Sequence, residues 1–263
     1  MRAKPAASIV TAVRITALLA AVLLSACVST GGQPAMDHRE AARANTELGA
    51  GYIRRGLDEA ARDKLERALE QDPRYAPAHA TYALLMARMG EDASADSHFR
   101  DALKLAPEDP DIRNNYGAFL CARGRVDAAV EQFQRAAEVP GYVGRVTALN
   151  NAGLCLRDRA PQQAETFLRR ALSLNAQNPT TLEQLAWVRY RQGEYLSARA
   201  FLERYQRVED PSAEALWLAA QVEEALGASD AAARYRQQLA AQYPDFDPRR
   251  LEAVRAQPND SRP

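Results

Sequence analysis

Cysteine is the residue type with the clearest capacity for covalent chemistry in this chain, which holds Cys27, Cys121 and Cys155. A cysteine can carry a lipid, pair with a second thiol, or act as a nucleophile when a base lies beside it. The three histidines are His38, His79 and His98. Their positions show no zinc-ligand spacing and suggest no cysteine–histidine pair. The pattern therefore favours lipidation or a disulfide over catalysis.

No other segment carries a motif for catalysis or for binding a cofactor. The chain has no glycine-rich phosphate loop, no Gly-x-Ser-x-Gly elbow and no carboxylate pair that stands apart from helix-surface charge. Charged residues recur at i,i+3 and i,i+4 spacings, as Arg62, Glu66 and Glu70 do, which is typical of solvated helix faces. We therefore expect a protein that is not an enzyme and has no metal, no cofactor and no small-molecule substrate.

Cys27 follows a segment with the layout of an export signal. Residues 1–26 contain three basic residues and no acidic one, and an apolar run extends from Ile15 to Leu24. A membrane-spanning helix needs about 20 apolar residues, so this shorter run fits a signal peptide. The sequence Leu24-Ser25-Ala26-Cys27 resembles the lipobox of bacterial lipoproteins. The resemblance implies that Cys27 is the lipidated first residue of the mature protein; an ordinary secretory signal is the alternative.

The residue after Cys27 and the overall charge bear on where the protein acts. Val28 stands where aspartate favours retention in the inner membrane, so the lipoprotein resemblance implies the outer membrane, facing the periplasm. Removing the leader's three basic residues leaves 31 basic against 34 acidic residues, a net charge of −3. Without a basic excess, we expect no binding to nucleic acid. Charges interrupt every later apolar run, so the lipid is the expected membrane attachment.

Four segments are predicted along the chain. Residues 1–26 are the lipoprotein signal peptide, and residues 27–41 are the lipidated cysteine with a flexible tether of polar and small residues. Residues 42–245 form the folded domain. Residues 246–263 form a polar C-terminal tail.

Small and apolar residues recur every 34 positions through the start of the folded domain. The four series are Gly49, Ala83 and Gly117; Ala61, Ala95 and Ala129; Leu65, Phe99 and Phe133; and Ala68, Ala102 and Ala136. This period and order of residue types are typical of tetratricopeptide repeats, each built from two antiparallel helices called A and B. Weaker matches continue through three further units. The sequence therefore predicts an all-α fold, a right-handed α-solenoid of about six tetratricopeptide repeats.

The recurring small residues have a physical reason. Glycine or alanine lets helix A approach helix B of its own repeat, and a larger residue there would cost about 1–3 kcal/mol through overpacking. A second group of glycines falls where each A helix should end, a place that suits a left-handed backbone. These glycines are Gly56, Gly90, Gly124, Gly193 and Gly227.

The repeats place Cys121 and Cys155 in the A helices of the third and fourth units. Neighbouring A helices pack side by side in this fold, so the two side chains can meet, and an exported compartment permits a disulfide. The alternative is two buried free thiols that fill small spaces.

In repeats of this kind the A helices line a concave groove, where we expect a protein partner to bind. The predicted groove residues are Ile53, Arg54, Leu84, Arg88, Asn114, Asn150 and Leu154. The leucines and isoleucine supply an apolar floor, arginine can hold a carboxylate, and asparagine can pair with a peptide backbone. The alternative for both asparagines is that they satisfy helix starts and polar groups between helices.

The same face of the last two repeats carries aromatic residues. Trp187, Tyr190 and Trp217 occupy A-helix positions there. They are either a second contact patch or the cover of a terminal repeat.

A lipobox leader, a short tether and six repeats together resemble the type IV pilus biogenesis/stability lipoproteins, the PilW/PilF family of pilotins for the pilus secretin. Residues 114–121 (Asn-Asn-Tyr-Gly-Ala-Phe-Leu-Cys) and 149–155 (Leu-Asn-Asn-Ala-Gly-Leu-Cys) resemble that family's third and fourth repeats, including the cysteine pair. The resemblance covers nearly all of the mature chain. It implies an assembly factor for type IV pilus (fimbrium) biogenesis that brings secretin subunits to the outer membrane, with the secretin as partner.

A different role is compatible with the same fold and anchor. A tetratricopeptide lipoprotein can serve as a scaffold for cell-wall hydrolases or for outer-membrane barrel assembly. An enzyme or an enzyme regulator is disfavoured because no catalytic site is recognised.

Overall fold

The computed structural model describes residues 37–249, and within this range the chain forms twelve α-helices and no strand. The helices are α2 (His38–Arg55), α3 (Asp58–Gln71), α4 (Ala76–Met89), α5 (Asp92–Leu105), α6 (Pro110–Ala122), α7 (Val126–Glu138), α8 (Arg145–Leu156), α9 (Pro161–Leu174), α10 (Pro179–Arg191), α11 (Tyr195–Tyr205), α12 (Ala213–Ala225) and α13 (Ser229–Gln242). They form six consecutive A–B pairs, α2 with α3 through α12 with α13. The predicted all-α tetratricopeptide fold is confirmed.

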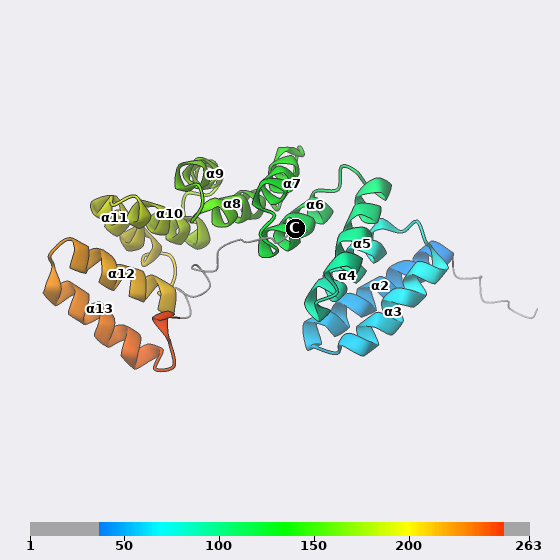
Figure 1. The fold of residues 1–263 in the computed structure, drawn as a ribbon, viewed down its shortest axis with the longest axis horizontal. Helices are drawn as coiled ribbons and strands as arrows, with labels where there is room; N and C mark the ends of the chain where they lie inside the picture. Colours follow the sequence, from blue (N-terminus) through cyan, green and yellow to red (C-terminus); the bar gives the residue numbers. More distant parts are fainter. Residues whose placement is uncertain (1–36, 250–263) are drawn as a thin grey trace, which may run out of the picture.

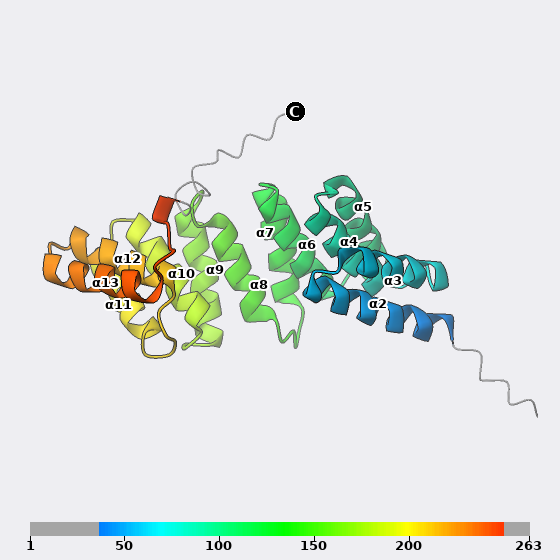
Figure 2. The same ribbon diagram turned by 90° about the horizontal axis from the view of Figure 1, so that it is seen from below.

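The six pairs follow one another along an arch (Figure 1). The A helices α4, α6, α8, α10 and α12 lie on the inner side, and their B partners lie on the outer side. Each helix packs against the next one in sequence, and each A helix also contacts the A helix of the following pair. Figure 2 shows the same succession of pairs from below. The inner side of the arch is therefore a surface made of A helices.

Close approach within each pair explains the small residues at the repeated positions. A Cβ atom added to Gly117 would lie 2.7 Å from Cε1 of Phe133, and one added to Gly49 would lie 2.6 Å from Cγ of Leu65. Phe133 and Leu65 are fully buried between the two helices of their pairs. The absence of a side chain at Gly117 and Gly49 thus makes room for the large residue opposite.

The turns between A and B helices use the predicted glycines. All five have positive φ angles, including 74° at Gly56 and 80° at Gly90, a region that residues with a Cβ rarely adopt. The fourth pair differs, because residues 157–160 join α8 to α9 without a glycine. Gly153 and Ala164 of this pair are 11 positions apart, whereas Gly117 and Ala129 of the third pair are 12 apart, so this turn is one residue shorter.

The folded part begins earlier than predicted. Helix α2 starts at His38, inside the segment assigned to the tether, because the Asp37 side chain accepts a hydrogen bond from the amide of Arg39. Ala41 and Ala42, near the start of α2, are already buried. The predicted leader and Cys27 lie outside the described residues, as does most of the tail. Within residues 37–249, no helix has the length and apolarity needed to cross a membrane.

Arginines at the ends of the A helices α4 and α6 join the second and third repeats to the repeat before each of them. The Arg88 guanidinium donates to the carbonyl oxygen of Ile53 at 2.9 Å and pairs with the Asp58 carboxylate at 3.0 Å. Arg123 makes the equivalent contacts one repeat later, with Asp92 and with a carbonyl oxygen of α4. The hydrogen bond from Arg123 lowers the pKa of Asp92. These contacts hold neighbouring A helices in register, and they position the inner face.

Candidate functional site

The inner face carries exposed apolar side chains on successive A helices. Leu84 on α4 is 38 % exposed and Leu154 on α8 is 47 % exposed, and the exposed Ala118 occupies the corresponding face of α6 between them. Exposed leucines are costly to leave in water, so their recurrence on one face favours contact with another apolar surface. Leu84 and Leu154 are exposed, and they stay predicted residues of the groove floor.

The N-terminal end of this face adds an available cation. Ile53 is half-buried and Arg54 is exposed, both on α2. Within residues 37–249, Arg54 forms no ion pair or side-chain hydrogen bond, so its guanidinium is available to a carboxylate on a partner. Arg88 differs, because its guanidinium is bonded to Ile53 and Asp58. We therefore assign Arg88 to joining repeats and no longer expect it to bind a partner.

The structure corrects the prediction for Asn150. Its side chain is only 6 % exposed. The amide nitrogen donates to Oδ1 of Asn178 at 3.1 Å, and the amide oxygen accepts from the Thr181 hydroxyl at 2.8 Å. Both bonds join α8 to the start of α10, so the buried amide is held in this contact between helices and is not accessible to a partner backbone. The alternative interpretation, a polar contact between helices, is the one that fits.

Asn114 has a similar but more accessible environment. Its Oδ1 accepts a hydrogen bond from the amide of Asn151 at 3.0 Å, and both side chains are half-buried. The amide nitrogen of Asn114 makes no hydrogen bond with the described residues, so it can donate to a bound segment. Asn114 stays a predicted contact residue.

Cys121 and Cys155 lie side by side on α6 and α8. The structure joins their sulfur atoms at 2.14 Å, with Cα atoms 5.8 Å apart. This Cα separation lies within the range that a disulfide requires. The bond links the third and fourth repeats on the same A helices that carry Ala118 and Leu154.

The aromatic residues of the last two repeats divide into buried and accessible members. Trp187 is 1 % exposed, so the prediction that it contacts a partner directly is corrected. Trp217 stacks on it with ring centroids 5.5 Å apart, and Tyr190 meets it edge-on at 6.2 Å. Trp217 and Tyr190 are half-buried, and they belong to the A helices α12 and α10, which lie on the inner side of the arch.

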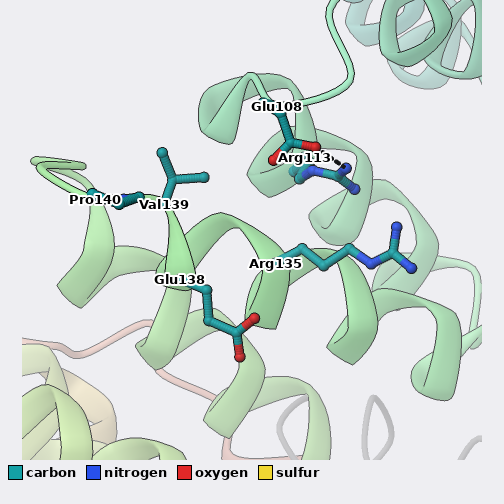
Figure 3. Close-up of a pocket in the computed structure, with 6 residues that line it drawn as sticks. All are labelled: Glu108, Arg113, Arg135, Glu138, Val139 and Pro140. Carbon is teal, nitrogen blue, oxygen red and sulfur yellow. Dashed lines mark ion pairs between the residues drawn. The ribbon is translucent and has the colours of Figure 1, made fainter.

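Two polar features were not anticipated from the sequence. An open pocket of about 500 Å³ lies between the start of α6 and the end of α7 (Figure 3). Its buried Arg113 donates to the Pro107 carbonyl and to Gln132, so this guanidinium holds the turn before α6. The ion pair of Arg113 with Glu108, drawn in Figure 3, further neutralises its charge. These bonds account for Arg113 without a ligand.

The second unanticipated feature is a pair of histidines on α4 and α5. Nδ1 of His79 lies 3.0 Å from Nδ1 of His98, and Nε2 of His79 lies 3.0 Å from the Pro73 carbonyl oxygen. A carbonyl only accepts, so Nε2 of His79 carries a proton and its Nδ1 accepts from His98. Burial lowers the pKa of His98, and the neighbouring His79 lowers it further. Within residues 37–249, no group of three or more potential ligands is arranged to hold a metal ion.

The sequence of this chain is similar to a known family model and to a known protein. Residues 78–143 match the family model described as tetratricopeptide repeat. The chain is 32 % identical to the type IV pilus assembly protein PilF of Pseudomonas aeruginosa over 231 residues, which is 86 % of this chain and 92 % of that protein.

Solved structures agree with the sequence comparison. A structure of Pseudomonas aeruginosa PilF superimposes with a TM-score of 0.71 at 31 % identity, covering 82 % of this chain and 99 % of that one. A crystal structure of PilW, described as a widely conserved type IV pilus biogenesis factor, gives a TM-score of 0.72 at 31 % identity, covering 81 % and 97 %. The chain therefore belongs to the PilF/PilW family of type IV pilus biogenesis proteins with tetratricopeptide repeats.

Proposed function

We propose that this protein is a lipid-anchored outer-membrane pilotin, which binds the type IV pilus secretin through the inner face of its repeats and promotes assembly of the secretin. The observation that carries the proposal is the exposed leucines, Leu84 and Leu154, on the inner face of a PilF/PilW family member. A binding surface of this kind suits an assembly factor, which must hold a client protein without altering it.

The strength of such binding can be gauged from the exposure of the two leucines. Fully burying a leucine is worth about 1.5–3 kcal/mol, and a little under half of each side chain is exposed, so each contributes about 1 kcal/mol when covered. Together Leu84 and Leu154 supply about 2 kcal/mol, roughly thirtyfold in affinity. Arg54 would bind a carboxylate of the partner segment and Asn114 a backbone carbonyl, and together they would fix the orientation of that segment.

The membrane part of the proposal depends on Cys27, which lies outside the described residues. Lipidation at Cys27 would place the folded domain near the outer membrane, with residues 28–36 as the link before Asp37. A Cys27→Ser variant should lose its acyl chains and leave the outer-membrane fraction for the soluble periplasmic fraction. An acylated Cys27→Ser protein that stays wholly in the outer membrane would contradict the anchor.

Co-purification from outer membranes tests the partner. The tagged full-length protein should retain the secretin after mild detergent extraction, and deletion of the gene should reduce the amount of secretin multimer. A second tetratricopeptide lipoprotein from the same cells serves as the control bait. Recovery of cell-wall hydrolases or barrel-assembly proteins in place of the secretin would contradict the pilotin role and favour the scaffold role.

A further inference from the structure

The inner face changes character at α10 and α12, where each helix pairs a carboxylate with an aromatic ring. On α10, Glu183, Trp187 and Tyr190 follow i, i+4, i+7 spacing, and on α12, Glu214 and Trp217 follow i, i+3 spacing. Residues at these spacings share one helix face. Because α10 and α12 are in contact, the two faces form one continuous surface.

The aromatic part of this surface already binds a cation from within the chain. The guanidinium carbon of Arg157 lies 5.4 Å from the centre of the Trp187 ring, and Trp217 stacks on Trp187 at an interplanar angle of 21°. Rings packed in this way attract cations through their negatively polarised faces. Trp217 is the more exposed of the two rings, so it is the one accessible to a cation from outside.

The carboxylate part carries charge that no cation of the described chain neutralises by direct contact. Glu183 accepts one hydrogen bond, from the Ser212 hydroxyl at 3.1 Å, and forms no ion pair within residues 37–249. Glu214 forms neither a hydrogen bond nor an ion pair there. Burial raises the pKa of Glu183 and the nearby Glu214 also raises it, whereas the Ser212 hydrogen bond and the charge of Arg157 act in the opposite direction. An incoming cation would relieve this repulsion.

We infer that the surface formed by Glu183, Tyr190, Glu214 and Trp217 binds a basic segment of the protein partner, with a lysine or arginine side chain against the Trp217 ring and between the two carboxylates. This inference rests on the proposed function, because it assigns a chemistry to one end of the same inner face. Charge complementarity identifies the occupant: two carboxylates beside an accessible ring suit a cation and repel an acidic segment.

The two ends of the inner face then differ in the sign of charge they accept. Arg54 at the N-terminal end offers an unpaired cation, whereas Glu183 and Glu214 at the C-terminal end offer carboxylates. A partner segment that is acidic at one end and basic at the other would therefore bind in one direction only. The exposed leucines between these ends would contact its apolar residues.

The tryptophans provide a direct readout, because the chain contains only two and both lie in this cluster. The full folded protein is titrated with an amide-capped peptide that alternates leucine with lysine, and the tryptophan emission is followed. A matched peptide with glutamate in place of lysine is the control ligand. The lysine peptide should change the emission saturably, and its affinity should weaken as salt rises from about 50 mM to about 500 mM. The glutamate peptide should produce no change.

Variants distinguish this surface from a merely structural aromatic cluster. Glu183→Gln with Glu214→Gln should lower the affinity for the lysine peptide at least about tenfold while the emission spectrum of the free protein stays the same. Glu59→Gln with Glu70→Gln, on the outer helix α3, removes the same charge elsewhere and should have no effect. Equal affinity in all three proteins, or an equal response to the glutamate peptide, would overturn the inference.

Failure of this inference is distinguishable from failure of the proposed function. If the secretin co-purifies equally with wild type and with the Glu183→Gln/Glu214→Gln variant, the pilotin proposal stands and the basic-segment site is wrong. If no secretin co-purifies but the lysine peptide binds as described, the site stands and the identity of the partner is wrong.

Discussion

Replacing Asn150 with alanine removes a side chain that holds α8 against α10. The change deletes the 3.1 Å bond to Asn178 and the 2.8 Å bond from Thr181. The Thr181 hydroxyl also lies 2.9 Å from Oδ1 of Asn178, so its single hydrogen keeps an acceptor after the change. The loss is therefore closer to one buried hydrogen bond than to two, about 1–2 kcal/mol. For a domain of this size, that lowers the melting temperature by roughly 2–8 °C.

The assay follows helicity by circular dichroism during heating, and it measures partner capture at a temperature where both proteins are folded. Asn114→Ala is the matched comparison for stability alone, because Asn114 accepts one hydrogen bond at a half-buried site and its loss should cost no more than about 1 kcal/mol. Since Asn114 is a predicted contact residue, capture by this variant should weaken. We expect Asn150→Ala to lower the melting temperature and to capture partner at the wild-type level once folded. An unchanged melting temperature together with reduced capture would refute this reasoning and return Asn150 to the contact surface.

Three further predictions concern packing, covalent structure and pH. Gly117→Ala should lower the unfolding free energy measured in urea by up to about 2 kcal/mol, because the overlap of the new Cβ atom with Phe133 outweighs the better helix propensity of alanine. A variant more stable than wild type would contradict the close approach of the two helices at Gly117. Protein isolated from the cell envelope without reductant should have Cys121 and Cys155 resistant to alkylation, and two free thiols would contradict the bond. Reduction should lower the unfolding free energy by about 3–4 kcal/mol, the value for a 34-residue loop. Because folding lowers the pKa of His98, the unfolded state binds a proton at this residue more readily than the folded state does. The contribution of neutral His98 to the unfolding free energy should therefore be complete above about pH 6.5 and should fall as the pH decreases below that value. A His98→Gln variant should show a shallower decline in urea midpoint between about pH 7 and pH 5, and an identical decline would contradict this assignment.

The repeat pattern was sufficient to predict the fold because its spacing encodes contacts between helices that are neighbours in sequence. Gly117 must be small because Phe133, sixteen residues later, occupies the space beside it. Gly56 and Gly90 fall where the chain must reverse direction with a positive φ angle. These constraints act within one repeat, so the sequence of one repeat displays them.

The roles of individual polar residues were harder to predict because their partners lie in the next repeat. Asn150 and Leu154 both occupy expected inner-face positions, yet the first is buried by polar contacts with α10 while the second remains exposed. The side chain of Arg88 reaches back to Asp58 and Ile53 in the preceding pair, which a pattern within one repeat does not reveal. Exposure of inner-face positions depends on how neighbouring A helices are offset, and this offset comes from three-dimensional packing.

The most direct test of the central claim, that the inner face holds the secretin, compares secretin capture by two double variants of matched chemistry. Leu84→Asp with Leu154→Asp alters the inner face, while Leu174→Asp with Leu196→Asp alters leucines of the outer helices α9 and α11 that are 52 % and 68 % exposed. The inner-face variant should bind secretin at least about thirtyfold more weakly than wild type, because it replaces central apolar contacts with charge, and the outer variant should bind as wild type does. Equal secretin capture by the two variants, with both folded, would contradict the account.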